Sequence, residues 1–198
     1  MIIRFAEETD SRELLRIYGQ YMDTPITFEY VLPSEEEFAG RIRSIRREGY
    51  PYLVCEEDGR AVGYAYAHRA FERAAYQWDA ELSIYLDKGH TAAGLGGRLY
   101  RILMELLALQ GVRTAYACVV SPNPKSERLH QRLGFERIGE FCNTGYKNGK
   151  WLDVVWFEKE LLAYEKNPAP PRPIGQAGEE ACREILERAN RELLAAFS

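Results

Sequence analysis

A cluster of three glycines offers the clearest chemistry in this sequence. Gly94-Leu95-Gly96-Gly97 lies between a strand-like run at 80–86 and a helix-like run at 98–110. A glycine turn that opens a helix presents unpaired backbone N–H groups and the positive end of the helix dipole, and phosphate groups bind there readily. A tight turn without any ligand has the same sequence, so the glycines alone leave both interpretations open.

Two common nucleotide-binding patterns are excluded at this turn. No Lys-Ser or Lys-Thr pair follows Gly97, which excludes a P-loop. The glycine spacing differs from the dinucleotide fingerprint, and the connection from Leu86 to Gly94 is long for that motif. A phosphate-bearing ligand at this turn would therefore be of another type.

The cysteines and histidines do not have metal-ligand spacing. No C-x-x-C pair occurs, and the histidines are scattered, so we expect no metal site. We expect free, buried thiols, because cytosolic thiols stay reduced and cysteine packs as a small hydrophobic residue. The four cysteines are Cys55, Cys118, Cys142 and Cys182, and the three histidines are His68, His90 and His130.

Composition and charge limit the classes of protein to which the chain can belong. Its 198 residues, 46% hydrophobic and 28% charged, suit one globular core with a soluble surface. With a net charge of −4, the chain lacks the excess of positive charge that is typical of a general nucleic-acid binder. No apolar run reaches membrane length, and the first residues lack a signal-peptide layout. We expect a cytoplasmic protein that binds neither nucleic acid nor membrane.

The elements that hold the glycine turn alternate between strands and helices. The pairs Asp58-Gly59 and Asn148-Gly149 predict hairpin turns, and the S-x-x-E pattern at Ser34 predicts the start of a helix. Hydrophobic periodicity supplies the remaining elements. The predicted strands are 2–5, 52–57, 61–67, 80–86, 113–120, 136–142 and 151–161, and the predicted helices are 10–23, 35–48, 98–110, 124–133 and 179–197.

The composition changes after Leu161. Residues 167–173 are rich in proline, which makes a stiff, extended linker. The last helix must bury an apolar stripe, either on its own domain or on a second subunit, and periodicity leaves both open. We divide the chain into a domain at 1–162, a proline-rich linker at 163–178 and an amphipathic helix at 179–198. The stripe contains Cys182, Ile185, Leu186, Ala189, Leu193 and Phe197.

The order of these elements, with the glycine turn at its centre, resembles the GNAT N-acetyltransferases. Three segments, at 71–97, 121–135 and 145–154, are similar to the phosphinothricin acetyltransferase branch of that family. The resemblance runs in order from Ile2 to Leu161 and leaves the later residues outside. It implies the GNAT fold, of the α/β (α+β) class, with a central mixed, mostly antiparallel twisted sheet, flanking helices and here a C-terminal helical extension.

The resemblance implies acetyl-CoA as the acetyl donor, without a metal. Its pantetheine arm would pair with the strand before the turn like an added strand, and its pyrophosphate would bind the N–H groups of the turn. Asn123, which also caps a predicted helix, and Ser126 match positions near the donor. The implied donor-binding residues are Ile84, Tyr85, Leu86, Ala92, Ala93, Gly94, Leu95, Gly96, Gly97, Asn123 and Ser126.

One departure concerns the turn itself. Thr91 stands where the family usually has Arg or Gln, and Ala92-Ala93 replace a more usual polar or glycine pair. The turn loses a positive side chain, for which Lys88 or Arg98 would compensate. We still expect binding, because the N–H groups and the helix dipole contribute most of the phosphate recognition.

The resemblance also assigns catalytic roles. Glu81 matches the catalytic glutamate of the family and is the candidate general base, acting through water or on a partly desolvated amine. A backbone N–H near Tyr85 or Leu86 is the expected oxyanion donor. His130 stands where many GNAT enzymes have a tyrosine that faces the departing thiolate. It would either donate a proton there or only pack and orient the donor.

The resemblance implies acceptor residues in two segments, one after the first predicted helix and one in the loop before Glu81. Phe28 and Glu29 match the wall of the acceptor site, and Arg73 and Tyr76 match substrate positions, where a guanidinium suits an acceptor carboxylate. Phe71 replaces a lysine that would help to hold an anionic acceptor group. This replacement argues against phosphinothricin and leaves methionine sulfone, methionine sulfoximine or an unrelated primary amine.

We therefore expect an acetyl-CoA-dependent N-acetyltransferase of a small amino-acid-like amine, with direct transfer in a ternary complex. Two alternatives remain: a protein acetyltransferase acting on N-termini or lysines, and a non-catalytic acyl-CoA sensor, which would need neither Glu81 nor His130. A homodimer is expected from the resemblance alone.

Overall fold

The computed structural model describes residues 1–91 and 94–197, so the expectation for Ala92 and Ala93 lies outside the described residues. The strands are β1 (Ile2–Phe5), β2 (Tyr52–Glu57), β3 (Arg60–Arg69), β4 (Asp79–Leu86), β5 (Thr114–Ser121), β6 (Glu136–Lys147) and β7 (Lys150–Glu160). The α-helices are α1 (Ser11–Gly19), α2 (Glu35–Arg47), α3 (Leu95–Gln110), α4 (Pro124–Arg132) and α5 (Glu179–Phe197).

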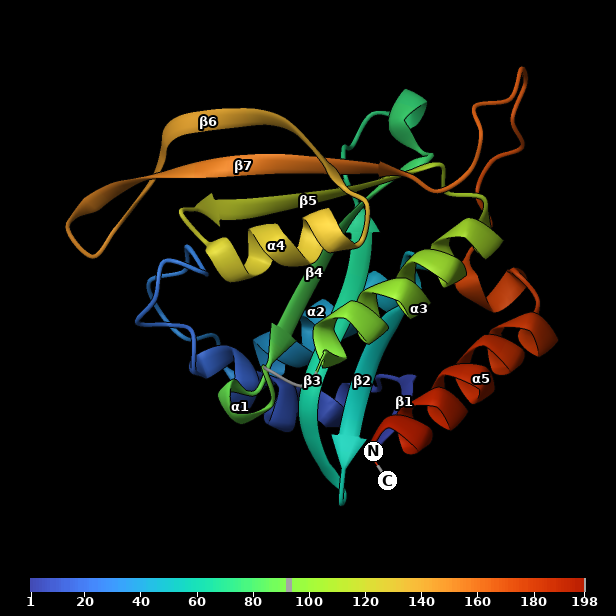
Figure 1. Ribbon diagram of the computed structural model, residues 1–198, viewed down its shortest axis with the longest axis horizontal. Helices are drawn as coiled ribbons and strands as arrows, with labels where there is room; N and C mark the ends of the chain where they lie inside the picture. The colour runs from blue at the N-terminus through green and yellow to red at the C-terminus, as the bar shows by residue number, and fades with distance from the viewer. Residues whose placement is uncertain (92–93, 198) are drawn as a thin grey trace.

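The described strands form one seven-stranded sheet in the order β1-β2-β3-β4-β5-β7-β6. Neighbouring strands are antiparallel except β4 and β5, which are parallel. Figure 1 shows α3 and α4 in front of the sheet and α1 and α2 behind it. The predicted architecture, a mixed and mostly antiparallel sheet with flanking helices, is confirmed.

Each face of the sheet has its own core. Leu82 of β4 packs with Leu99 and Leu103 of α3 on one face. Leu14 and Ile17 of α1 pack with aromatic residues of β2 and β3 on the other. Burial of these apolar side chains holds β4 between two layers of helices, which makes it a rigid strand on which to build a site.

Local sequence signals explain most element ends. Ser34 and Glu37 form both halves of a capping box at the start of α2. Both predicted hairpins are present, and Asn148 and Gly149 have φ angles of 52° and 77°, as a tight hairpin turn requires. The β2–β3 turn has the same signature at Asp58 and Gly59, with φ angles of 50° and 77°.

Three predicted ends were wrong. The helix α1 ends at Gly19 rather than near Asp23, and tight turns follow it, such as the bond from Tyr21 N to Tyr18 O (2.9 Å). The helix α3 begins at Leu95 rather than Arg98. The strand β6 continues to Lys147 rather than ending near 142, because two register irregularities carry the pairing with β7 past its glycines and polar residues.

The prediction of buried thiols was correct for two cysteines and wrong for two. Cys55 and Cys182 are buried, whereas Cys118 and Cys142 are exposed, and all four thiols are free. Cys142 lies on β6, the edge strand of the sheet. Cys118 lies on β5 beyond the point where β4 stops pairing with it, and its side chain lines the cavity that opens there.

The last helix, α5, packs on its own chain. Of the two alternatives for its apolar stripe, its own domain or a second subunit, the structure shows the first. Cys182 and Leu193 are buried in the core that α3 forms, and Figure 1 shows α5 alongside α3. Asn190 closes the edge of the sheet: its Oδ1 accepts from Ile3 N (2.6 Å), and its Nδ2 donates to Ile3 O (2.9 Å). The helix thus pairs with an edge strand that would otherwise be open.

Candidate active site

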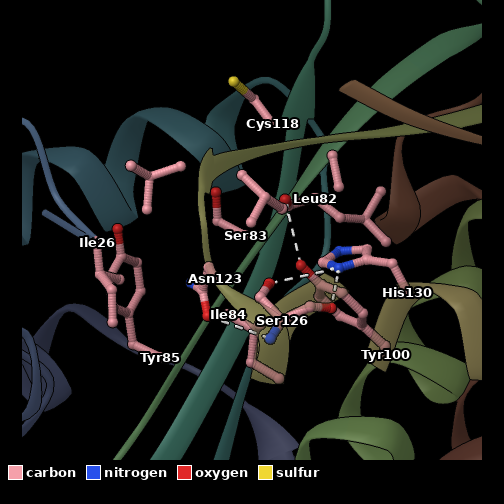
Figure 2. A pocket seen from close by; sticks show the side chains of 13 residues that line it. Ile26, Leu82, Ser83, Ile84, Tyr85, Tyr100, Cys118, Asn123, Ser126 and His130 are labelled. Atoms are coloured by element: carbon pink, nitrogen blue, oxygen red, sulfur yellow. Dashed lines mark hydrogen bonds between the residues drawn. The ribbon is translucent and has the colours of Figure 1, made fainter. Parts of the chain in front are cut away.

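A cavity of about 80 Å³ opens where β4 and β5 diverge. The parallel pairing of these strands covers only Asp79 to Glu81 on β4, and the cavity lies beyond it. Figure 2 shows His130, Ser126 and Tyr100 grouped on one side of it, with Ile26 and Tyr85 on the other. The lining residues are Ile26, Leu82, Ser83, Ile84, Tyr85, Tyr100, Ala117, Cys118, Val119, Val120, Asn123, Ser126 and His130.

The register of β4 decides which of its backbone groups face this gap. Hydrogen bonds donated by the N–H groups of Ala70 and Asp87 lie at the two ends of the β3–β4 ladder. Because bonded and non-bonded pairs alternate in an antiparallel ladder, the odd-numbered residues from 79 to 87 bond to β3. Ile84 and Leu86 therefore direct their backbone groups toward the gap. The backbone of Tyr85, which was also expected to bind the donor, pairs with β3 instead.

Two carbonyl groups on the gap side of β4 accept hydrogen bonds from tyrosine hydroxyls. Tyr100 donates to Leu82 O (3.4 Å), and Tyr21 donates to Leu86 O (2.5 Å). No side chain in the described part of the chain bonds to the backbone of Ile84. This residue is therefore the natural point at which an extended ligand would add to the strand.

The glycine turn forms the start of α3. Gly94 precedes the helix with a φ of 72°, a left-handed conformation that favours glycine. Leu95, Gly96 and Gly97 make up the first helical positions, and such N–H groups have no partner within a helix. The turn therefore provides the array of N–H donors and the positive dipole end that a phosphate needs.

Asp87 holds the segment that leads into the turn. Its carboxylate accepts from Arg16 Nη1 (2.7 Å), from Gln20 Nε2 (3.0 Å) and from Gly89 N (3.0 Å). Burial raises the pKa of Asp87, but the bonds from Arg16, Gln20 and Gly89 outweigh it and hold the pKa well below its usual range. The charged carboxylate therefore fastens this segment to α1 at neutral pH.

The start of α4 faces the cavity. Asn123 is its N-cap, and its Oδ1 accepts from Ser126 N (3.3 Å). Glu127 accepts from Asn123 N in return (2.9 Å). The predicted capping role is confirmed, and both Asn123 and Ser126 also line the cavity.

His130 is buried beneath the cavity with 1% of its surface exposed. Its Nδ1 donates to Ser126 O (2.8 Å), because a carbonyl only accepts. Burial lowers the pKa of His130, and the bond to Ser126 opposes this only in part. The neutral ring thus carries a lone pair at Nε2, which is buried and without a partner in the described residues.

Aromatic rings surround His130. Its ring stacks on Phe157 (5.2 Å between centroids, 16°) and meets Phe135 and Tyr100 edge to face (5.2 and 5.4 Å). A neutral ring held in this way has no proton at Nε2 to give to a thiolate. Of the two alternatives for His130, the geometry favours packing and orientation over proton donation.

Glu81 borders the cavity without lining it. It lies at the last pair that β4 shares with β5, opposite Tyr116. Burial raises the pKa of Glu81, and the charge of His68 opposes this in part. Although Cys118 is exposed, neighbouring atoms partly desolvate its thiol, and this desolvation, followed by the charge of Glu81, raises the pKa of Cys118 to about 11. Glu81 is therefore a desolvated carboxylate beside the cavity, the setting expected of a general base.

The segment between α1 and α2 is fastened to the β6–β7 hairpin. Lys147, 4% exposed, donates to Thr27 O (2.6 Å), and Tyr30 donates its hydroxyl proton to Tyr146 O (2.5 Å). The ring of Phe28 lies so close over Gly145 that an added Cβ would clash with three ring carbons, Cε2 and, at 2.7 and 2.8 Å, Cζ and Cδ2. The absence of a side chain at Gly145 thus leaves room for the ring of Phe28.

The other expected acceptor residues lie outside the cavity wall. Glu29 forms an ion pair with Arg41 (2.7 Å) on α2. Tyr76 contacts Phe71 (5.0 Å), which in turn contacts Tyr116 (5.7 Å), so these rings continue the surface beside Glu81. Arg73 lies in the same loop, directly before the short 3-10 helix Ala74–Tyr76, and is exposed.

The cavity brings together the predicted residues Ile84, Tyr85, Asn123, Ser126 and His130. It also includes residues that sequence reasoning missed, among which Ser83, Tyr100 and Cys118 carry polar side-chain atoms. No role was predicted for Tyr100 from the sequence, and Cys118 was expected to be a buried thiol. Only the divergence of β4 from β5 shows that both face one space, and no local signal marks that point.

The described residues contain no group of three or more histidine, cysteine, aspartate or glutamate side chains arranged to hold a metal ion. Within the same ranges, none of the helices has the length and apolar character that crossing a bilayer requires.

Comparison with known proteins identifies the family. Residues 3–156 match the acetyltransferase (GNAT) domain. The phosphinothricin N-acetyltransferase of Streptomyces viridochromogenes is 33% identical over 173 residues, which cover 87% of this chain and 92% of that protein. The chain is an N-acetyltransferase of the GNAT family.

Two further GNAT relatives bear on donor and acceptor. The L-methionine sulfoximine/L-methionine sulfone acetyltransferase of Salmonella typhimurium is 30% identical, covering 81% of this chain and 95% of that protein. The solved phosphinothricin acetyltransferase of Sinorhizobium meliloti, in complex with acetyl-CoA, has a TM-score of 0.80 and 34% identity. It covers 87% of this chain and 97% of its own.

The residues present fit the donor that the Sinorhizobium relative carries. The free edge at Ile84 suits the amides of an extended pantetheine arm. The start of α3 suits a pyrophosphate. The unpartnered Nε2 of His130 offers a hydrogen-bond acceptor within the cavity between them.

Proposed function

We propose that this chain transfers the acetyl group of acetyl-CoA to the primary amine of a small amino-acid-like acceptor, directly and within a ternary complex. The observation that carries the proposal is the divergence of β4 from β5 next to Glu81. It leaves a free strand edge and a cavity between a helix N-terminus and a desolvated carboxylate.

In this proposal the backbone of Ile84 and Leu86 binds the pantetheine arm, and the N–H groups of Leu95, Gly96 and Gly97 bind the pyrophosphate. When bound, acetyl-CoA supplies an acyl group activated as a thioester. Asn123 and Ser126 line the cavity beside the donor in this proposal.

Glu81 accepts the proton that the acceptor ammonium must lose before its nitrogen becomes nucleophilic. The raised pKa of this carboxylate narrows the gap to that of the amine and so favours the transfer. Direct transfer is supported by the state of Cys118, the thiol on the cavity wall. Its pKa of about 11 keeps it protonated near neutral pH, whereas an acyl-enzyme route would need a thiolate.

Amino-acid-like acceptors are supported by the relatives, which are named for phosphinothricin and for methionine sulfoximine and sulfone. Arg73 is the candidate partner of an acceptor carboxylate. Phe71 contributes a ring rather than a cation to the surface near Glu81, which supports the methionine derivatives over phosphinothricin.

A screen of amines, followed by thiol release from acetyl-CoA, tests this proposal. The panel contains phosphinothricin, L-methionine sulfoximine, L-methionine sulfone, and peptides with a free N-terminus or a lysine. We expect release with the methionine derivatives and little with the peptides. Fast acetylation of a peptide would favour a protein acetyltransferase, and binding of acetyl-CoA without turnover of any amine would favour a sensor.

We further infer that the enzyme works as a homodimer in the cytoplasm. The exposed free thiols of Cys118 and Cys142 suit a reducing compartment. The β6–β7 hairpin exposes Phe141, Tyr146 and Trp151, a set of rings typical of an interface. Light scattering after size exclusion should give twice the mass of one chain, and a monomer at all concentrations would contradict the dimer.

A further inference from the structure

The residue opposite Glu81 on β3 is a histidine. His68 and Glu81 are direct partners in the antiparallel ladder, so their side chains extend from the same face of the sheet. Their pair is one of those that exchange backbone hydrogen bonds, in which Cα atoms lie about 5.5 Å apart. The side chains are close enough for the charge of His68 to oppose in part the rise that burial causes in the pKa of Glu81.

The ring of His68 has a defined tautomer. Its Nδ1 lies 3.0 Å from Arg69 O, and because a carbonyl only accepts, Nδ1 carries the hydrogen. In the neutral ring, Nε2 then holds a lone pair that can take a proton. The ring also contacts Tyr66 (6.1 Å between centroids, 36°) and is only half-buried, so it reaches solvent.

The reaction under the proposed function must release a proton at each turnover. An ammonium acceptor and a thioester give an amide, a free thiol and one proton. The C–N bond forms as the C–S bond breaks, and the thiolate keeps one of the two protons that the nitrogen loses. The other proton must travel from the half-buried Glu81 to bulk water before the next cycle.

Other groups that face Glu81 are poorly suited to carry this proton. Burial raises the pKa of the Cys118 thiol to about 11 and that of the Tyr116 phenol to about 12, and the pKa of Tyr66 and of Tyr100 is also raised. These groups hold their protons at neutral pH. Histidine is the side chain whose charge ordinarily changes between pH 5 and 8. The ionisable neighbours of Glu81 are His68 and Tyr66 of β3, Asp79 of β4, Tyr116 and Cys118 of β5, and Tyr100 of α3.

We propose that His68 is a positioning residue for proton export: its Nε2 receives, through one bridging water, the proton that Glu81 takes from the acceptor amine, and releases it to bulk solvent. This inference rests on the proposed function. His130 is unsuited to the task, because aromatic rings enclose it and separate it from solvent.

Two substitutions of His68, with L-methionine sulfoximine as the acceptor, separate proton export from other roles of this residue. His68→Gln should lower kcat about tenfold near pH 7 and leave the KM for acetyl-CoA unchanged. Added imidazole should restore kcat. The acidic limb of kcat/KM should move to higher pH, because a charge that lowers the pKa of Glu81 is gone. His68→Lys should keep the acidic limb of kcat/KM near its original pH. Its kcat should still be low unless imidazole is added.

The matched control is Arg69→Gln, which removes a neighbouring exposed cation whose side chain extends from the other face of β3. Its kcat, its KM for acetyl-CoA and the acidic limb of its kcat/KM should equal those of the unmodified enzyme. Normal kcat in His68→Gln, or a loss that imidazole does not restore, would overturn the inference. If Glu81→Gln is inactive in the same assay, the proposed function survives that outcome. If Glu81→Gln is fully active, the proposed proton acceptor itself is wrong.

Discussion

Burial shifts the pKa of Glu81 and of His130 in opposite directions, and in each case the shift favours the uncharged form. For Glu81, a raised pKa makes a stronger base beside the acceptor. For His130, a lowered pKa removes the proton that its place near the thiolate seemed to offer. The same physical cause thus supports the proposed role of Glu81 in proton transfer and a packing role for His130.

The pH dependence of stability isolates His130. Its pKa is lowered on folding, so the unfolded chain binds the proton more tightly, and stability falls as pH drops below the unfolded value of about 6.5. Relative to His130→Gln, the unmodified protein should lose up to about 1.4 kcal/mol of unfolding free energy per pH unit between about pH 6 and 5. Urea unfolding at pH 5, 6, 7 and 8 measures this. A difference between the two proteins that is constant with pH would show that His130 is not held neutral.

Among single residues, the sequence predicts those whose role depends on their neighbours along the chain. Gly94 and Asn123 were found because a turn and a helix cap depend on adjacent residues. His68 was missed, because its importance comes from its register opposite Glu81, and no spacing along the chain encodes that pairing.

The candidate site depends most on β4, because this strand leaves part of its edge toward β5 without hydrogen bonds. Its hydrogen bonds to β3 continue from Asp79 to Leu86, while its pairing with β5 stops at Glu81. Periodicity predicted both strands as elements, but it does not report where two parallel strands separate. The length of β6 was underestimated for a related reason, since bulges near Gly139 and Gly145 interrupt the period of two that marks a strand.

The start of α3 gives a test of donor binding. Gly96→Glu should abolish acetyl-CoA binding, because it puts a negative charge at the helix N-terminus where phosphate charge would bind. Gly96→Ala is the control, since an added Cβ meets its nearest neighbours, Leu86 and Ile84, at 3.4 and 3.5 Å. Isothermal titration calorimetry measures both. Normal binding of acetyl-CoA by a folded Gly96→Glu protein would contradict the binding of the pyrophosphate at this turn.

The β6–β7 hairpin gives a test of the acceptor wall. In Gly145→Ala, the new methyl group displaces the ring of Phe28, so the KM for the acceptor should rise several-fold, as expected for a weakened binding contact. The KM for acetyl-CoA should not change. Gly139→Ala is the matched control on the same strand, because a Cβ there meets nothing within 4 Å. Equal acceptor KM values in the two variants would exclude Phe28 from the acceptor site.

At the scale of the whole molecule, α5 and the linker close the fold. Asn190 pairs with Ile3 at the sheet edge, and Trp78 donates to Ala169 O of the linker (2.9 Å). The apolar stripe of α5 was predictable from its period of 3.6, but the surface it covers was not. Periodicity shows that a face is buried and leaves open which partner buries it.

Loss of the α5 contact should destabilise the whole chain. Leu193→Ala should lower the free energy of unfolding by about 2–5 kcal/mol, because Leu193 is fully buried in the core shared with α3. Glu192→Ala, at the exposed neighbouring position, should change it by less than about 0.5 kcal/mol. Denaturant titration measures both. Equal stability of the two variants would contradict the packing of α5 on this core.

Acceptor-dependent thiol release by Glu81→Gln tests the central claim most directly. With acetyl-CoA and L-methionine sulfoximine, the unmodified enzyme should release thiol and form the N-acetylated acceptor. Glu81→Gln should bind acetyl-CoA normally and turn over about 10²–10⁴ times more slowly near neutral pH. Turnover of this variant at the unmodified rate across the pH range would contradict the account, because Glu81 would then not be the proton acceptor.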